Sequence, residues 1–264
     1  MTGKVLWLGR LMTGAQPTGD MVDLSTHSAA TGGSPHLRGY AVRPPGDERL
    51  PGVVVIHEIF GPDDVNKRSA DRMAALGYSV ILPDLFTEGG PRKCLKATFQ
   101  ALRSGHGRAF QDIAAARQWL IDREDATGDV GIIGYCMGGG FALMCAAPSR
   151  GFQVSSVNYG QLPPTPEVLQ GACPVVASYG ARDRGNEEVP AKLEYHLTRL
   201  GVPHAVKQYP NAGHAFLNDD DIGPWWLQPL FRLGHAGPEP ESAADAWRRI
   251  DAFFADHLHA TDRR

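Results

Sequence analysis

The sequence predicts an α/β fold in which helices cover both faces of a mostly parallel central sheet. The main observation is a series of short apolar runs that do not alternate with polar residues, a pattern typical of strands buried on both faces. Amphipathic segments with helical spacing lie between several of these runs, and this alternation favours parallel strands joined by helices. A chain of 264 residues is long enough for one such domain, so we expect a single domain over residues 1–264.

The predicted elements follow one another in a regular order. Two short antiparallel strands are expected first, at 21–25 and 37–42, and the buried strands follow at 53–56, 79–82, 130–133, 154–157, 174–178 and 205–208. Helices are expected at 65–76, 106–122, 189–200 and 247–258, where apolar residues recur at helical spacing, and directly after the glycine-rich turn at 134–140. Because open parallel sheets bind ligands at the carboxyl ends of their strands, we expect functional residues just after these runs.

The composition argues against several classes of protein. Acidic residues number 29 and basic residues 26, which gives a formal charge of −3, with no basic excess to bind nucleic acid or an anionic membrane. No apolar run approaches the roughly 20 residues of a membrane-spanning helix, and the apolar stretch within residues 1–10 is too short for a secretory signal. The four cysteines lack zinc-ligand spacing and favour reduced thiols without a metal site. We therefore expect a soluble, cytoplasmic protein.

One cysteine occupies the turn between a predicted strand and a predicted helix. Gly134-Tyr135-Cys136-Met137-Gly138 has the spacing of a nucleophile elbow, G-x-S-x-G, with cysteine in place of serine. Small residues at both ends of the motif prevent clashes in so sharp a turn, and the start of the following helix favours a thiolate. The alternatives are a buried structural cysteine and a nucleotide-binding loop, although the glycine spacing differs from G-x-G-x-x-G. We predict that Cys136 is the nucleophile.

A cysteine nucleophile needs a base that a third group orients. In hydrolases with this elbow, the acid and then the histidine follow the nucleophile along the chain. Asp183 comes just after the predicted strand at 174–178, and His214 lies in a short glycine-containing loop after the predicted strand at 205–208. We therefore predict that Asp183 is the orienting acid and His214 the base.

The motifs around these residues resemble the dienelactone hydrolase family, a branch of the α/β-hydrolase fold. The resemblance rests on HEIFG at 57–61, PDLF at 83–86, GYCMGG at 134–139, YGA at 179–181 before Asp183, and AGHAF at 212–216. It implies a hydrolase of carboxylic esters or lactones, of the carboxymethylenebutenolidase type, that needs no cofactor. It also implies that the triad of Cys136, His214 and Asp183 acts through an acyl-thioester intermediate on a small-molecule substrate.

The resemblance assigns roles to residues outside the triad. Glu58 is implied to help form the thiolate, and the backbone N–H groups of Ile59 and Met137 are implied to form the oxyanion hole, as the general rule for this fold expects. Family members hold a substrate carboxylate with an arginine four residues after the catalytic histidine, where this chain has Asn218. Arg103 is a candidate for a second such arginine. Whether the substrate carries a carboxylate is therefore left open.

Two segments fall outside the resemblance. Residues 1–20 form an N-terminal extension, and residues 221–237 look like an insertion between the histidine loop and the last helix. The insertion carries Trp225, Trp226 and Phe231, which we predict to contact substrate. Because apolar side chains in a long loop indicate a lid or an interface, we expect one of these two roles, with a small capping helix as the alternative. The chain is expected to be a monomer or a homodimer.

Two other functions are compatible with the same residues. The triad could serve an acyltransferase or a thioesterase, which differ from an esterase in the acceptor or in the bond that is cleaved. A non-catalytic protein of this fold could instead bind a ligand or sense oxidants through Cys136, although such a protein has no use for Cys136, Asp183, His214 and Glu58 together.

Overall fold

The computed structural model describes residues 16–258, and within them a single sheet forms the centre of the molecule. Two short strands open it, β1 (Asp20–Asp23) and β2 (Arg38–Val42). The strands that follow are β3 (Leu50–Ile56), β4 (Ser79–Pro83), β5 (Ala126–Tyr135), β6 (Ser155–Asn158), β7 (Val175–Gly180) and β8 (His204–Tyr209). Their order in the sheet is β1-β2-β4-β3-β5-β6-β7-β8, and only the pairs β1–β2 and β2–β4 are antiparallel. The predicted mostly parallel sheet is therefore confirmed.

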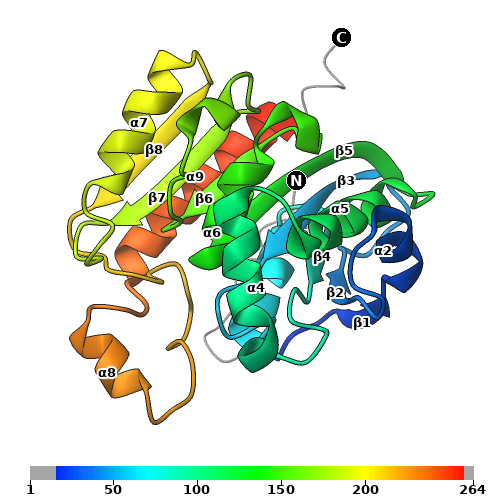
Figure 1. Cartoon of the computed structure of the whole chain (residues 1–264), viewed down its shortest axis with the longest axis horizontal. Helices are drawn as coiled ribbons and strands as arrows, with labels where there is room; N and C mark the ends of the chain where they lie inside the picture. The colour runs from blue at the N-terminus through cyan, green and yellow to red at the C-terminus, as the bar shows by residue number, and fades with distance from the viewer. Residues whose placement is uncertain (1–15, 259–264) are drawn as a thin grey trace.

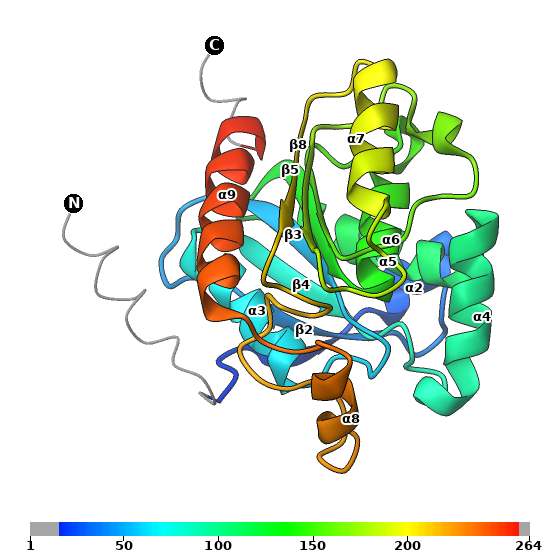
Figure 2. The same ribbon diagram turned by 90° about the vertical axis from the view of Figure 1, so that its left-hand side faces the viewer.

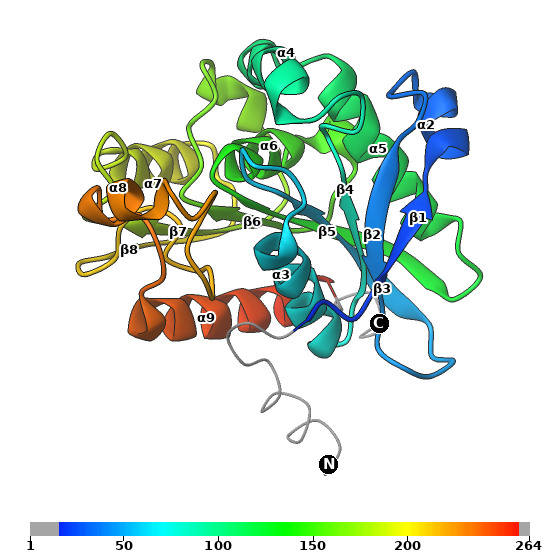
Figure 3. The ribbon, with the colours of Figure 1, turned by 90° about the horizontal axis from the view of Figure 1, so that it is seen from below.

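Helices cover both faces of this sheet, as the sequence predicts (Figures 1 and 3). One face is covered by α3 (Asp64–Ala75) and α9 (Pro240–Leu258), and the other by α5 (Arg108–Ile121), α6 (Met137–Cys145) and α7 (Val189–Arg199). Two further helices pack outside this second layer. They are α2 (Ser25–Thr31), which lies against α5, and α4 (Pro91–Ser104), which lies against α5 and α6.

Sequence and structure differ in β1 and in two helices. The first strand ends at Asp23, not at residue 25, because Ser25 begins α2 and its N–H is bound by the Asp23 carboxylate at 2.8 Å. Neither α2 nor α4 was predicted. The fully buried residues of α4 are Cys94, Thr98 and Ala101, which are small or polar, and its apolar residues Leu95 and Leu102 are partly buried against the core.

The register of the strands brings their carboxyl ends together. Ile56 at the end of β3 pairs with Gly134 near the end of β5, and Asn158 at the end of β6 pairs with Tyr135. On the far side, Gly180 at the end of β7 pairs with Tyr209 at the end of β8. The loops that follow these strands therefore start at one edge of the sheet, where an open parallel sheet places its functional site.

The predicted insertion, residues 221–237, contains the short helix α8 (Gln228–Leu233) and stands away from the sheet (Figures 1 and 2). Of the predicted N-terminal extension, residues 1–15 lie outside the described residues. None of the helices between residues 16 and 258 combines the length and the apolar character needed to cross a membrane.

Candidate active site

Cys136 lies in the turn between β5 and α6 with a strained backbone. Its φ is 55° and its ψ is −118°, which is unfavourable for any residue with a side chain. The turn is so tight that a Cβ on Gly134 would lie 2.0 Å from the carbonyl oxygen of Gly138. A Cβ on Gly138 would lie 2.2 Å from the carbonyl oxygen of Ile56. Steric constraints therefore require glycine at both ends of the predicted elbow. The backbone of the turn sets the direction of the Cys136 side chain, which is half-buried.

A carboxylate fixes the orientation of the nearby imidazole. Nδ1 of His214 donates to Oδ2 of Asp183 at 2.8 Å, and the Asn186 side-chain amide donates to the same oxygen at 2.7 Å. Asp183 is only 4% exposed, and the Gln161 amide in turn donates to Asn186. With its Nδ1 proton held in this way, His214 presents Nε2 to the rest of the site.

The charge of His214 depends on both of its polar neighbours. Burial favours the neutral ring, but hydrogen bonds to Asp183 and to Cys136 outweigh burial and raise the pKa of His214 to about 11. The Cys136 side chain therefore lies near the imidazole. The ring also packs against Tyr159, with 5.0 Å between ring centroids. A protonated imidazole in this position stabilises a thiolate and can later give its proton to a leaving group.

Glu58 follows β3 and is buried beside the same groups, with an exposure of 3%. The side-chain amide of Asn218 lies 3.4 and 3.3 Å from its two carboxylate oxygens, and the Tyr159 hydroxyl donates to Asn218 Oδ1 at 3.4 Å. Burial raises the pKa of Glu58 to about 7, although the charge of His214 and the Asn218 amide oppose the shift. This carboxyl group can therefore gain or release a proton near neutral pH.

The raised pKa of Glu58 predicts how stability depends on pH. Between its ordinary value of 4.5 and the folded value of about 7, the folded protein holds a proton that the unfolded chain has released. The free energy of unfolding should therefore fall as the pH rises through this window, and above it the accumulated loss is about 1–3 kcal/mol. Glu58→Gln does not titrate, so it should gain about that much stability over the wild type between pH 4.5 and 8.

Urea unfolding of the two proteins across this pH range measures the difference. Glu48→Gln, at an exposed position, serves as the matched control and should follow the wild type at every pH. A stability difference between Glu58→Gln and the wild type that stays constant from pH 4.5 to 8 would contradict the raised pKa.

Sequence reasoning missed three residues that support this arrangement. His57, directly after β3, is fully buried: the N–H of Leu85 donates to its Nε2 at 3.1 Å, and its Nδ1 then donates to the carbonyl of Glu58 at 2.6 Å. Burial lowers its pKa, which keeps the ring neutral and suits this tautomer. Tyr159 and Asn186 are the other two. A polar or aromatic residue directly after a buried strand was the available signal for His57 and Tyr159, whereas nothing in the sequence marks Asn186.

Two backbone N–H groups lie beside these side chains. They belong to Ile59, which follows Glu58, and to Met137, which follows Cys136 at the first turn of α6. Within residues 16–258, neither group donates to a protein acceptor. Both are therefore available to a ligand at the carboxyl ends of β3 and β5.

The residues predicted to contact substrate are scattered. Trp225 and Trp226 are 81% and 62% exposed. Phe231 is half-buried against Phe60, with 6.1 Å between the ring centroids. Arg103 lies on α4 and lines a cavity of about 1070 Å³ whose lining residues do not include Cys136, Asp183 or His214. Of the four residues predicted to contact substrate, only Phe231 therefore lies next to the loop that contains Glu58 and Ile59.

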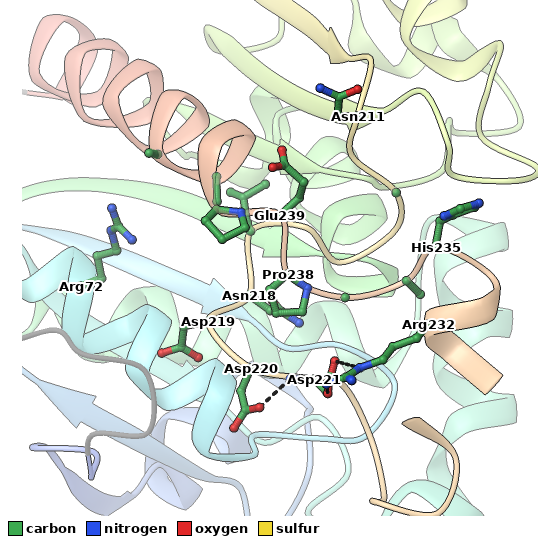
Figure 4. Close-up of a pocket in the computed structure, with 17 residues that line it drawn as sticks. Arg72, Asn211, Asn218, Asp219, Asp220, Asp221, Arg232, His235, Pro238 and Glu239 are labelled. Atoms are coloured by element: carbon green, nitrogen blue, oxygen red, sulfur yellow. Dashed lines mark hydrogen bonds and ion pairs between the residues drawn. The ribbon is translucent and has the colours of Figure 1, made fainter. Parts of the chain in front are cut away.

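A second cavity, of about 670 Å³, borders the loop of His214 (Figure 4). Its walls come from this loop, from the two ends of the insertion and from the start of α9, and charged side chains such as Asp219, Asp220 and Arg232 line it. None of the triad residues lines it. Among the described residues, no group of three or more potential metal ligands is close enough to hold an ion.

Comparison with known proteins gives a consistent result. The chain is 28% identical over 232 residues to a carboxymethylenebutenolidase of Rhodococcus opacus, which covers 78% of this chain and 81% of that protein. A dienelactone hydrolase-like promiscuous phosphotriesterase from metagenomic libraries superposes with a TM-score of 0.74 at 24% identity, over 92% of this chain and all of that chain (100%). The dienelactone hydrolase of Anabaena variabilis superposes with a TM-score of 0.63 at 21% identity, over 92% of this chain and 100% of that one.

These similarities confirm the α/β-hydrolase fold that the sequence predicts. The model of the dienelactone hydrolase family matches residues 37–258, which is most of the chain and includes every strand of the sheet after β1. This protein is therefore a hydrolase that belongs to the dienelactone hydrolase family.

Proposed function

We propose that this hydrolase cleaves a carboxylic ester or a lactone by covalent catalysis at Cys136. The observation that supports this most directly is the position of Cys136: a strained turn at the end of β5 holds it beside His214, whose other ring nitrogen donates to Asp183 at 2.8 Å. A nucleophile, a base and a group that orients the base are the three parts that acyl transfer needs. The similarity to the carboxymethylenebutenolidase of Rhodococcus opacus supports the same proposal, since the name of that relative fits a lactone substrate.

In the first half of the reaction, the Cys136 thiolate attacks the carbonyl carbon of the substrate. The oxyanion that forms is bound by the N–H groups of Ile59 and Met137, and loss of one such donor typically costs about 3–4 kcal/mol of transition-state stabilisation. His214 gives its proton to the alkoxide as the C–O bond breaks, which leaves an acyl thioester on Cys136.

In the second half, the neutral His214 accepts a proton from water while the water oxygen attacks the thioester. The C–S bond then breaks, the carboxylic acid leaves, and the thiolate and the imidazolium are restored. Asp183 keeps its hydrogen bond to the ring throughout and stabilises the charged ring. Glu58, whose pKa is raised to about 7, is proposed to accept the proton of the resting Cys136 thiol before the attack and to return it to the thiolate after the product has left.

Mass spectrometry of the protein mixed with a small aryl ester tests the covalent intermediate. We expect the acyl group on the peptide that contains Cys136, while the peptides of Cys94, Cys145 and Cys173 stay unmodified. Steady release of the phenol without any acylated cysteine would overturn the proposal. Adding an alcohol or a thiol and analysing the products distinguishes hydrolysis from transfer to another acceptor.

A further inference from the structure

The insertion, residues 221–237, projects from the sheet but packs against one side chain at the edge of the sheet where the candidate active site lies. That side chain is Phe60, which directly follows Ile59. The rings of Phe60 and Phe231 meet edge to face, with 6.1 Å between centroids and an interplanar angle of 72°. Gly223 lies beside both rings: a Cβ there would be 2.7 Å from Cζ of Phe60 and 3.2 Å from Cε2 of Phe231.

The position of Phe231 is in turn tied to the histidine loop. Arg232 pairs with Asp221 across the base of the insertion (Figure 4), with 3.1 Å between Arg232 Nε and Asp221 Oδ1. The backbone N–H of Ala236 donates to the carbonyl of Phe231 at 2.8 Å, and the N–H of Gly237 donates to the carbonyl of His214 at 2.8 Å. The insertion therefore links the loop of His214 to the loop of Ile59.

The loop of Ile59 has few hydrogen bonds of its own. On its near side, the carbonyl of Glu58 accepts from His57 at 2.6 Å and, at 3.3 Å, from the N–H of Gly61. Beyond Ile59, the chain lies in a turn without helix or strand hydrogen bonds, and the packing of the Ile59 and Phe60 side chains holds it instead. Because an oxyanion donor acts only when it is held in place before the reaction, the restraint on Phe60 bears on catalysis.

We propose that the insertion positions the Ile59 N–H by holding Phe60, with Gly223 and Phe231 as the positioning residues. The inference rests on the proposed function, in which this N–H stabilises the oxyanion. Release of the Phe60 ring lets the turn at Ile59 adopt several conformations and weakens the donor. The nucleophilicity of Cys136 does not depend on the packing of Phe60 and should not change.

Phe231→Ala tests the proposal with two rates measured on the same protein. We expect kcat/KM for a small aryl acetate to fall by about 10-fold or more, and by no more than the factor of about 10²–10³ that complete loss of a donor causes. The rate at which iodoacetamide alkylates Cys136 should stay unchanged, because that displacement forms no oxyanion. Phe231→Leu keeps an apolar contact with Phe60 and should restore part of the activity.

Leu230→Ala is the matched control, since Leu230 precedes Phe231 on α8 but is 64% exposed. It should keep both rates. Gly223→Ala places a methyl group against the same ring and should repeat the loss seen in Phe231→Ala, because its Cβ would lie 2.7 Å from Cζ of Phe60 and a φ of +72° is unfavourable for alanine.

Three results would overturn the inference: an unchanged kcat/KM in Phe231→Ala, an equal fall in the alkylation rate, or the same loss in Leu230→Ala. A loss that grows with the length of the acyl chain would also overturn it, because that result indicates contact with substrate instead of positioning. If instead the proposed function is wrong, the wild-type protein itself forms no acyl-enzyme, which distinguishes that case from the three results above. Thermal unfolding of each variant shows that it is folded.

Discussion

Cys136→Gly is expected to abolish ester hydrolysis and yet to unfold at a higher temperature than Cys136→Ala. Both variants lack the sulfur, so neither can form the thioester, and turnover should fall to the rate without the enzyme. They differ only in the Cβ at a residue whose φ is 55° and whose ψ is −118°.

The expected difference in stability follows from two opposing effects. A residue with a Cβ in so sparsely populated a backbone region is destabilised by about 1–3 kcal/mol, and glycine releases that strain. Glycine also gives the unfolded chain more freedom, which costs roughly 0.5–1 kcal/mol relative to alanine. Because the strain outweighs the added freedom of the unfolded chain, Cys136→Gly should be more stable than Cys136→Ala by about 1 kcal/mol.

Thermal unfolding, urea unfolding and an ester assay on the two variants check both parts of this prediction. Residual turnover in either variant above the uncatalysed rate would show that another group carries the reaction. A Cys136→Ala variant more stable than Cys136→Gly would show that the turn is not strained in the folded protein.

The parts of the site that the sequence predicted are those that follow from local rules. Cys136 was predicted because a sharp turn demands small residues around it, and Asp183 and His214 because each comes shortly after a strand. These relations need only neighbours in the chain and the knowledge that parallel strands end at one edge of a sheet. The predicted strands accordingly match the observed ones within a few residues.

The parts that were missed depend on contacts between distant segments. The raised pKa of Glu58 comes from burial by residues that follow other strands, and the amide of Asn218, which reaches it across the sheet edge, is 160 positions away in the chain. Asn186 supports Asp183 through a side-chain hydrogen bond that no pattern in the sequence predicts. The exposed aromatic residues of the insertion indicate a lid or an interface, while its contact with Phe60 could be seen only in the structure.

Gly134→Ala is expected to destabilise the protein by more than about 4 kcal/mol, which exceeds most single substitutions. The added Cβ would meet three backbone atoms, the carbonyl oxygen and carbon of Gly138 at 2.0 and 2.3 Å and the nitrogen of Gly139 at 2.9 Å. Gly134 cannot retreat, because it is paired with Ile56 of β3 on one side and with Val157 of β6 on the other.

The helix cannot retreat either, because Gly138 packs directly on the last carbonyl of β3, where a Cβ would be 2.2 Å from the oxygen of Ile56. Gly234→Ala is the matched control: its φ is −83° and its Cβ would lie 3.3 Å from the nearest atom, so it should behave like an ordinary surface substitution. Soluble yield and urea unfolding compare the two. A Gly134→Ala protein that is as stable as Gly234→Ala and fully active would mean that β5 and α6 are farther apart than the elbow requires, and Cys136 would then lose the strained turn that directs it toward His214.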